Sequence, residues 1–145
     1  MIALLQRVKH ASVTVDNQTV GAIDHGLLVF LAVEKNATPD TAQRLLQRIL
    51  TYRVFADVEG KMNLSVLDVQ GGLLVVSQFT LAADTQKGTR PSFTPAAPPA
   101  LAKELYDYFV NEAHGECANV QTGIFAADMQ VSLLNDGPVT FSLRA

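Results

Sequence analysis

The chain has 145 residues, of which 48% are hydrophobic and 17% are charged. One domain with its own core fits this length, and a charged fraction below the usual value of about 25% leaves apolar surface that favours self-association. The formal net charge of −3 excludes a broad, non-specific nucleic-acid binder, which needs a basic face, but it is compatible with a protein that grips one RNA end.

Cysteine usage and hydropathy bear on the compartment. Cys117 is the only cysteine, so no internal disulfide can form, and a reducing, cytoplasmic compartment is expected. No apolar stretch is long enough to span a membrane, and Met1 to Arg7 lacks the charge order of a signal peptide. The histidines share no metal-type spacing with Cys117 or a carboxylate cluster, so we expect no metal and no cofactor.

The first part of the chain predicts strands. Ile2–Val8 is a strand, and the alternating stretches Ser12–Asp16 and Thr19–Asp24 form a hairpin around Asn17-Gln18. Leu27–Val33 is a continuously apolar strand. Three strands before any helix favour an antiparallel start over a doubly wound sheet.

A helix is predicted from Thr38-Pro39-Asp40, because a hydroxyl cap, a proline and an acid open a helix well. Leucine and isoleucine then recur at helical spacing as far as Leu50. The pattern next predicts a short strand at Tyr52–Phe55, a turn at Asp57–Gly60 and an edge strand at Lys61–Ser65.

The stretch Leu73–Leu81 is the centre of the predicted fold. Its first four residues are apolar without a polar face, which is typical of a strand buried on both sides, although periodicity alone also allows a short buried helix. Gly71-Gly72 before it favours the strand. Ser77, Gln78 and Thr80 then place polar groups at the rim of a rigid scaffold; they either form a site or simply cap the strand.

The remainder predicts a long loop, Ala82–Pro95, and a second helix that starts at Pro98-Pro99 and ends at Gly115. A helix end at Gly115 separates His114 from Cys117 and favours a free core cysteine over a Cys–His pair. Strands are predicted at Val120–Phe125, Met129–Leu134 and Val139–Leu143. Considered alone, Asn135–Pro138 is a tight turn and Arg7 lies on a solvated face of its strand.

Two motifs carry a resemblance to a known family. Ser77–Leu81 (SQFTL) and Asn135–Thr140 (NDGPVT), in this order and at this chain length, resemble D-aminoacyl-tRNA deacylase, also called D-tyrosyl-tRNA deacylase. Further matching stretches run along nearly the whole chain: Arg7-Val8, Ala11–Val15, Gly60–Asn63, Arg90–Phe93 and Phe125–Met129. The chain departs from the family at Ala32, where glycine is usual, and it matches poorly at 84–88 and 112–119, onto which no role is carried.

The resemblance implies one α/β domain over residues 1–145, with a mixed, largely antiparallel, barrel-like sheet and two helices packed on it. It implies a homodimer that cleaves the ester between a D-amino acid and the terminal adenosine of tRNA, with no DNA or membrane partner. Its implied site residues are a catalytic strand end of Ser77, Gln78, Phe79 and Thr80, a chirality filter of Gly137 and cis Pro138 from the partner subunit, Arg7 in support, and Phe125 and Met129 at the adenosine.

Two other classes of function stay open on the residues alone. One is a non-catalytic protein that binds RNA ends, and the other is a serine or threonine hydrolase of small esters. No histidine or lysine lies near Ser77 or Thr80 in sequence to activate a hydroxyl, although a distant base can fold close. We therefore expect that no side chain is the nucleophile and that the substrate's own 2′-hydroxyl assists.

Overall fold

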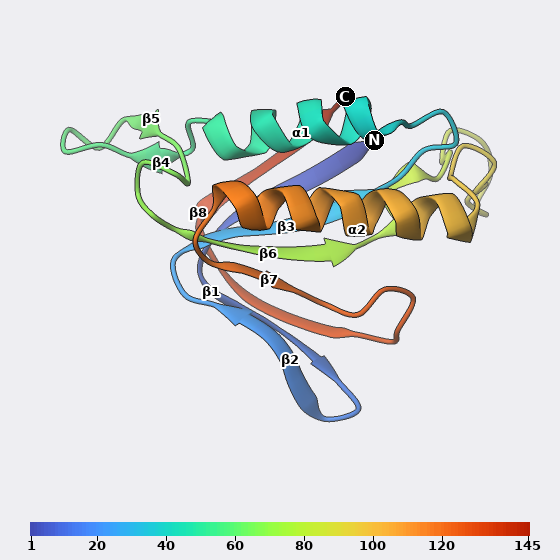
Figure 1. Cartoon of the computed structure of the whole chain (residues 1–145), viewed down its shortest axis with the longest axis horizontal. Helices are drawn as coiled ribbons and strands as arrows, with labels where there is room; N and C mark the ends of the chain where they lie inside the picture. The colour runs from blue at the N-terminus through green and yellow to red at the C-terminus, as the bar shows by residue number, and fades with distance from the viewer.

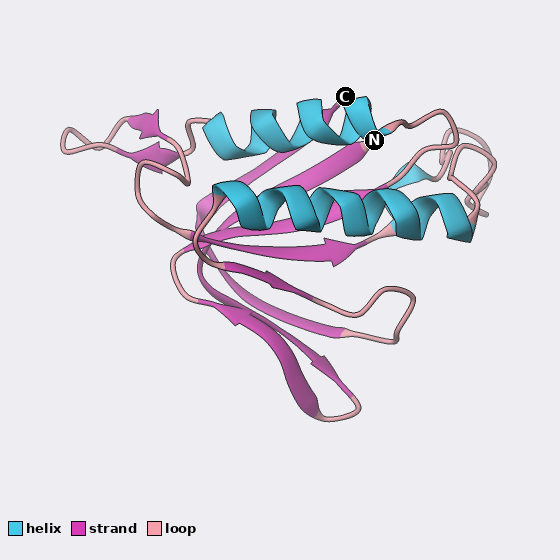
Figure 2. Ribbon diagram, viewed as in Figure 1, coloured by secondary structure: helices cyan, strands magenta, loops and turns pink.

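Two helices lie side by side on one face of a strongly curved sheet (Figures 1 and 2). The computed structural model describes every residue from Met1 to Ala145. The strands of the main sheet are β1 (Ile2–Val15), β2 (Gln18–Ile23), β3 (Gly26–Ala32), β6 (Gly72–Ser77), β7 (Val120–Thr122) and β8 (Gln130–Arg144). The remaining elements are the helices α1 (Pro39–Thr51) and α2 (Pro99–Glu116), the 3-10 turn η1 (Phe79–Ala82) and a small hairpin of β4 (Phe55–Ala56) and β5 (Met62–Leu64).

The long strand β1 organises the sheet. Its first half pairs with β3 and its second half with β2, while β8 runs antiparallel to nearly its whole length. β6 then joins β3 in parallel, and β7 joins β6 in parallel. The antiparallel start predicted from the sequence and the mixed sheet implied by the family resemblance are therefore confirmed.

The sheet curls until β2 approaches β7, which nearly closes a barrel. The approach depends on Gly21 in β2, because a Cβ there would lie 2.3 Å from the carbonyl oxygen of Thr122 in β7. No side chain fits at that distance, so glycine is the residue that permits the closure.

Both faces of the central strands are buried. Leu73 and Val75 belong to a cluster of 25 buried residues between the sheet and the helices, whereas Leu74 and Val76 belong to a second cluster inside the curl. Successive side chains of a strand point to opposite faces, so an uninterrupted apolar run is what such a position requires. The strand interpretation of Leu73–Val76 is confirmed.

The first helix begins where the sequence predicts. The Thr38 hydroxyl accepts a hydrogen bond from the N–H of Thr41 at 3.2 Å, and the Thr41 hydroxyl accepts one from the N–H of Thr38 at 3.3 Å. Pro39 is the first helical residue, where its missing N–H costs nothing. The second helix runs one residue past Gly115, so the predicted end is wrong; the N–H of Cys117 closes the last turn on Ala113 at 2.9 Å.

Several predicted strand boundaries are also wrong. Ile2–Val8 and Ser12–Asp16 merge into β1, and the last two predicted strands merge into β8, because β1 and β8 pair along nearly their whole length, with register shifts around Val8. The predicted strand Val120–Phe125 ends at Thr122, where its pairing with β6 ends. Neither helix is long and apolar enough to cross a membrane.

Candidate active site

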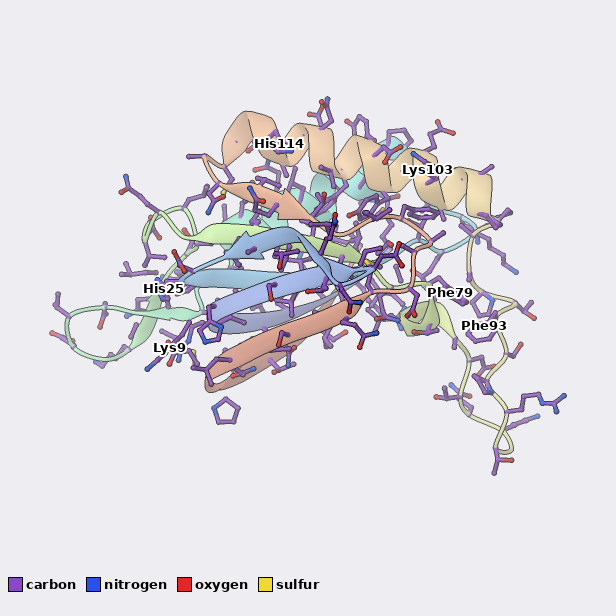
Figure 3. All side chains as sticks on the ribbon, turned by 90° about the horizontal axis from the view of Figure 1, so that it is seen from below. Lys9, His25, Phe79, Phe93, Lys103 and His114 are labelled. Atoms are coloured by element: carbon purple, nitrogen blue, oxygen red, sulfur yellow. The ribbon has the colours of Figure 1, made fainter.

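The strand β6 ends earlier than predicted, and its end builds an exposed turn. The N–H of Gln78 donates to the carbonyl of Leu31 at 2.8 Å, which is the last bond to β3. The chain then winds into η1, where the N–H of Leu81 closes on Gln78 at 3.2 Å. Ser77 and Gln78 are half-buried, whereas Phe79 and Thr80 are exposed. Figure 3 shows Phe79 beyond the end of the sheet. The predicted strand Leu73–Leu81 stops at Ser77.

The hydroxyl of Thr80 has no activating base. Its only hydrogen-bond partner is the Gln78 side-chain amide, which donates to the hydroxyl oxygen. A nucleophilic threonine needs a neighbouring group that takes its proton, and an amide nitrogen does not. The backbone N–H groups of Phe79 and Thr80 precede the first hydrogen bond within η1, so the turn itself gives them no carbonyl partner.

Gly137 and Pro138 lie in an irregular part of β8, not in a free turn between two strands. From Arg144 back to Thr140, β8 pairs with β1 in a regular register. The register then shifts, so that Val8 of β1 lies opposite Asn135. The Gly137-Pro138 bond is cis. The Asn135 side chain spans the irregularity, because its Oδ1 accepts from the N–H of Val139 at 2.7 Å and its Nδ2 donates to the Val139 carbonyl at 3.2 Å.

Arg7 supports the same segment from β1. Its Nε donates to the carbonyl of Asp136 at 2.8 Å, and its Nη1 donates to the carbonyl of Val54 at 2.6 Å. The Asp136 carboxylate lies 3.8 Å from the Arg7 Nε, and the Arg7 side chain is only 14% exposed. The expectation of a solvated face is therefore wrong, while the position next to Gly137-Pro138 is the one that the family resemblance implies.

Within one chain, the strand end and the Gly137-Pro138 segment lie far apart. Across the sheet, the Gly137-Pro138 segment is in register with Leu27 at the start of β3, through Arg7 of β1. Ser77 pairs with Leu31 near the end of β3. Four residues of strand span about 13 Å, and the path from β8 to β6 adds three spacings of about 4.8 Å each. A single subunit therefore does not bring the two predicted parts of the site together.

Phe125 lines a cavity of about 500 Å³ between α2 and the end of β7. Its ring packs on Tyr106 with 5.8 Å between the centroids. The Tyr106 hydroxyl donates to the carbonyl of Val75 at 2.8 Å, and burial, reinforced by the charge of Asp107, raises the pKa of this phenol well above its ordinary value. Met129 does not line the cavity; it packs on Gly123, where a Cβ would lie 2.5 Å from its sulfur.

The polar lining of this cavity was missed in the sequence. Lys103, Asp107, Asn111 and His114 follow one another at helical spacing on α2, which places them on one side of the helix. That spacing is visible in the sequence, but it is equally typical of a solvated face. Cys117 is buried and free, and its thiol donates to the carbonyls of Gly71 and Asn119 and not to His114; no group of three metal-ligating side chains is present.

Comparison with known proteins identifies the family. A family model described as D-Tyr-tRNA(Tyr) deacylase matches residues 4–144. D-aminoacyl-tRNA deacylases from Janthinobacterium sp. (strain Marseille) and Glaesserella parasuis serovar 5 (strain SH0165) are 62% and 65% identical over 99% of this chain, and the alignments cover 97% and 99% of those proteins.

Two solved structures share the fold. A protein described as c-Myc DNA Unwinding Element Binding Protein is 38% identical with a TM-score of 0.95, and the match covers 100% of this chain and 99% of that one. A probable eukaryotic D-amino acid tRNA deacylase is 17% identical with a TM-score of 0.82 and 98% of both chains covered, which speaks for the fold alone. The family resemblance is confirmed: the chain belongs to the family of D-aminoacyl-tRNA deacylases, which are hydrolases.

Proposed function

We propose that this chain hydrolyses the ester of D-aminoacyl-tRNA, and of glycyl-tRNA as well, and rejects L-aminoacyl-tRNA through a segment supplied by a second copy of the chain. Membership of the deacylase family supports the reaction type. The observation that carries the finer proposal is the split site. An exposed turn follows a rigid strand at Ser77–Thr80, and a pinned backbone segment at Gly137-Pro138 lies at a distance within the same subunit.

We infer a homodimer because only a second subunit can bring the two parts together. Apolar surface on β8 supports this, since Leu134 is 47% exposed and Phe141, whose ring packs on Tyr52, is 36% exposed in the single chain. β8 also pairs with β1 alone, so its outer edge has no neighbour. Long strands with an open edge and apolar side chains are usually covered in native proteins. The unpaired Cys117 supports a reducing compartment, so we infer action in the cytoplasm.

The role of Gly137-Pro138 in this proposal is steric. Neither residue offers side-chain chemistry, so selectivity must come from the shape of a backbone that Arg7 and Asn135 hold in place. Its carbonyl oxygens accept hydrogen bonds from the substrate ammonium group. With the ammonium and the ester both fixed, the side chain of an L-amino acid strikes this backbone and that of a D-amino acid points away. A clash rejects a substrate more strongly than the loss of one contact.

Glycine follows from the same geometry. A glycyl ester has no side chain that can clash, so a filter that works only by exclusion accepts it. Cleavage of glycyl-tRNA is therefore an expected property of this site. If glycyl-tRNA were not cleaved, the site would have to recognise the D side chain by an attractive contact, which this proposal does not include.

The chemistry in this proposal uses no protein nucleophile. The ester lies next to the ribose 2′-hydroxyl of the substrate, which assists water, while the turn at Phe79 and Thr80 orients the ester. Backbone N–H groups at the start of η1 donate to the oxyanion as the ester carbonyl becomes tetrahedral. Phe125, and less directly Met129, support the terminal adenosine beside α2.

The first experiment incubates the purified protein with D-tyrosyl-, L-tyrosyl- and glycyl-tRNA and follows the free amino acid. We expect release from the D-tyrosyl and glycyl substrates only. Binding without release favours a non-catalytic RNA-end binder, and complete resistance of glycyl-tRNA counts against a filter that acts by exclusion. Light scattering of the same sample should give about twice 15.6 kDa, and an active monomer overturns the shared site.

A second experiment separates this mechanism from a serine or threonine hydrolase. D-tyrosyl-tRNA that ends in 2′-deoxyadenosine should resist hydrolysis, whereas Thr80→Ala should keep a measurable part of the wild-type rate. The opposite pair of results, or an isolated aminoacyl-protein ester, identifies Thr80 as the nucleophile.

A further inference from the structure

We propose that the hairpin of residues 84–92, together with Phe79 and Phe93 at its base, is an arm that binds the single-stranded 3′ end of the tRNA next to the terminal nucleotide. This inference rests on the proposed function, because it names the surface that receives the rest of the same substrate. Family resemblance assigns nothing to this hairpin, whose first half matches the family poorly.

The arm has a defined shape although it carries almost no regular structure. Asp84 and Ser92 exchange two backbone hydrogen bonds, of 2.8 and 3.0 Å, which close its base. The Asp84 carboxylate accepts from the N–H of Gln86 at 3.0 Å and fixes the first bend. Figure 3 shows the segment projecting away from the body of the molecule, with Phe79 and Phe93 where it leaves. The arm is thus anchored within a few residues of Thr80.

Phe79 and Phe93 form an open aromatic surface at the base. Their ring centroids are 5.0 Å apart and the rings are tilted by 52°. They remain 58% and 43% exposed, so each ring keeps a face free after packing on the other. Proteins that bind single-stranded nucleic acid combine positive charges, which follow the phosphate backbone, with exposed aromatic rings. Unpaired bases stack on these rings, because every base has a flat aromatic face.

The charges of the arm are opposite to the charge of the whole protein. Lys87 and Arg90 are exposed near its tip, and neither lies within ion-pairing distance of a carboxylate. Lys35, whose backbone N–H donates to the Pro95 carbonyl at 3.1 Å, is a third exposed cation without a carboxylate partner, and it lies beside the segment that follows the arm. Asp84 is the only acid among residues 84–92, so the two cations outnumber it, and Glu34 is paired with Arg144 at 3.1 Å.

Unpaired Lys and Arg side chains on a protein with a net charge of −3 indicate that an anionic ligand binds at this surface. A nucleic-acid strand fits better than a protein partner, because the cations and the aromatic faces occur together and beside the turn that would hold the ester. A second subunit that covers the two rings would satisfy the apolar surface but leave the charges of Lys87 and Arg90 unexplained.

The experiment compares a full substrate with a minimal one. The double variant Lys87→Ala/Arg90→Ala and the single variant Phe93→Ala are assayed on D-tyrosyl-tRNA and on 3′-O-D-tyrosyl-adenosine, which has no further nucleotides. A double variant Arg44→Ala/Lys61→Ala removes the same charges from exposed positions outside the arm and serves as the control.

For the tRNA substrate, we expect KM to rise about tenfold in both arm variants, which corresponds to about 1.4 kcal/mol. The slope of log KM against log salt should fall by about 1.4 in the double variant, since each single-strand phosphate contact contributes about 0.7. Hydrolysis of the adenosine ester should not change in any variant, and the control should behave as wild type on both substrates.

Three other results would each lead to a different conclusion. Wild-type KM and salt dependence in the arm variants overturn the arm while leaving the deacylase proposal intact. Equal losses on both substrates, together with a monomer in light scattering, mean that the arm packs on the partner subunit and binds no RNA. A wild-type protein that releases no D-tyrosine from tRNA refutes the proposed function itself.

Discussion

The end of β6 and the Gly137-Pro138 segment of β8 are both interruptions of strands, but they are supported in different ways. β6 is backed by apolar side chains on both faces, and it stops where β3 stops pairing with it. The β8 segment is held by polar groups, namely the Arg7 guanidinium and the Asn135 amide.

The two kinds of support leave different groups free to contact a substrate. An apolar scaffold leaves the polar groups that follow it free, so the β6 end can offer hydrogen-bond donors to a reacting ester. A polar anchor uses its own donors to fix a backbone, so the β8 segment is left with the shape of that backbone and its free carbonyl oxygens.

The largest effect is expected at the β6 end. Phe79→Pro removes the backbone N–H at the first position of η1, where proline fits a helical turn. Loss of one donor to an oxyanion typically lowers kcat by about 10²–10³-fold. Phe79→Ala removes the ring but keeps the N–H, so its kcat should stay near that of wild type. Equal kcat values for the two variants would mean that this N–H does not stabilise the transition state.

Next in size is the recovery of activity in a mixed dimer. Gly137→Val should inactivate its own segment, because even a Cβ at this position would lie 2.5 Å from the Val139 nitrogen. A purified heterodimer of Phe79→Pro and Gly137→Val chains carries one intact site if the segment acts in trans, so it should regain about half of the wild-type activity. An inactive heterodimer, with the parent variants folded and dimeric, would place both parts of the site in one subunit.

A smaller effect is expected from the anchor of the β8 segment. Arg7→Met keeps an unbranched side chain but loses the hydrogen bonds to Asp136 and Val54, each worth about 1.5–3 kcal/mol for a charged donor. Discrimination between D- and L-tyrosyl-tRNA should fall about tenfold, with most of the D activity retained. Arg7→Lys should not rescue it fully, since an ammonium lacks the fork that reaches both carbonyls. Unchanged selectivity in a destabilised Arg7→Met would make this residue purely structural.

The smallest effect concerns the backing of β6. Tyr106→Phe removes the hydrogen bond to the Val75 carbonyl, which also accepts from the Gly123 N–H at 3.2 Å, and should cost about 1 kcal/mol of unfolding free energy. The pKa of Tyr106 is raised by burial, so its stabilising contribution is complete below the unfolded value of about 10 and declines above it. Denaturation midpoints of the two proteins should therefore converge as the pH rises beyond 10. A constant gap would argue against the buried neutral phenol.

The sequence by itself predicted the elements whose signals are local. The cap at Thr38 and the uninterrupted apolar run at Leu73–Val76 each need only a few neighbouring residues to act, and both are confirmed. The two motifs at Ser77–Leu81 and Asn135–Thr140 also sufficed to identify the family, because their order and spacing are specific.

Only the tertiary structure decided where strands end and what their polar residues meet. β1 continues through Lys9 and His10 because β8 pairs alongside, and β6 stops at Ser77 because β3 offers no further partner; neither cause lies in the local pattern. Arg7 alternates with its neighbours as a solvated charge would, yet the carbonyls of Val54 and Asp136, which are 47 and 129 residues away, hold it in a half-buried position. Long-range pairing and buried polar partners are set by how distant segments pack, and no short stretch of sequence contains them.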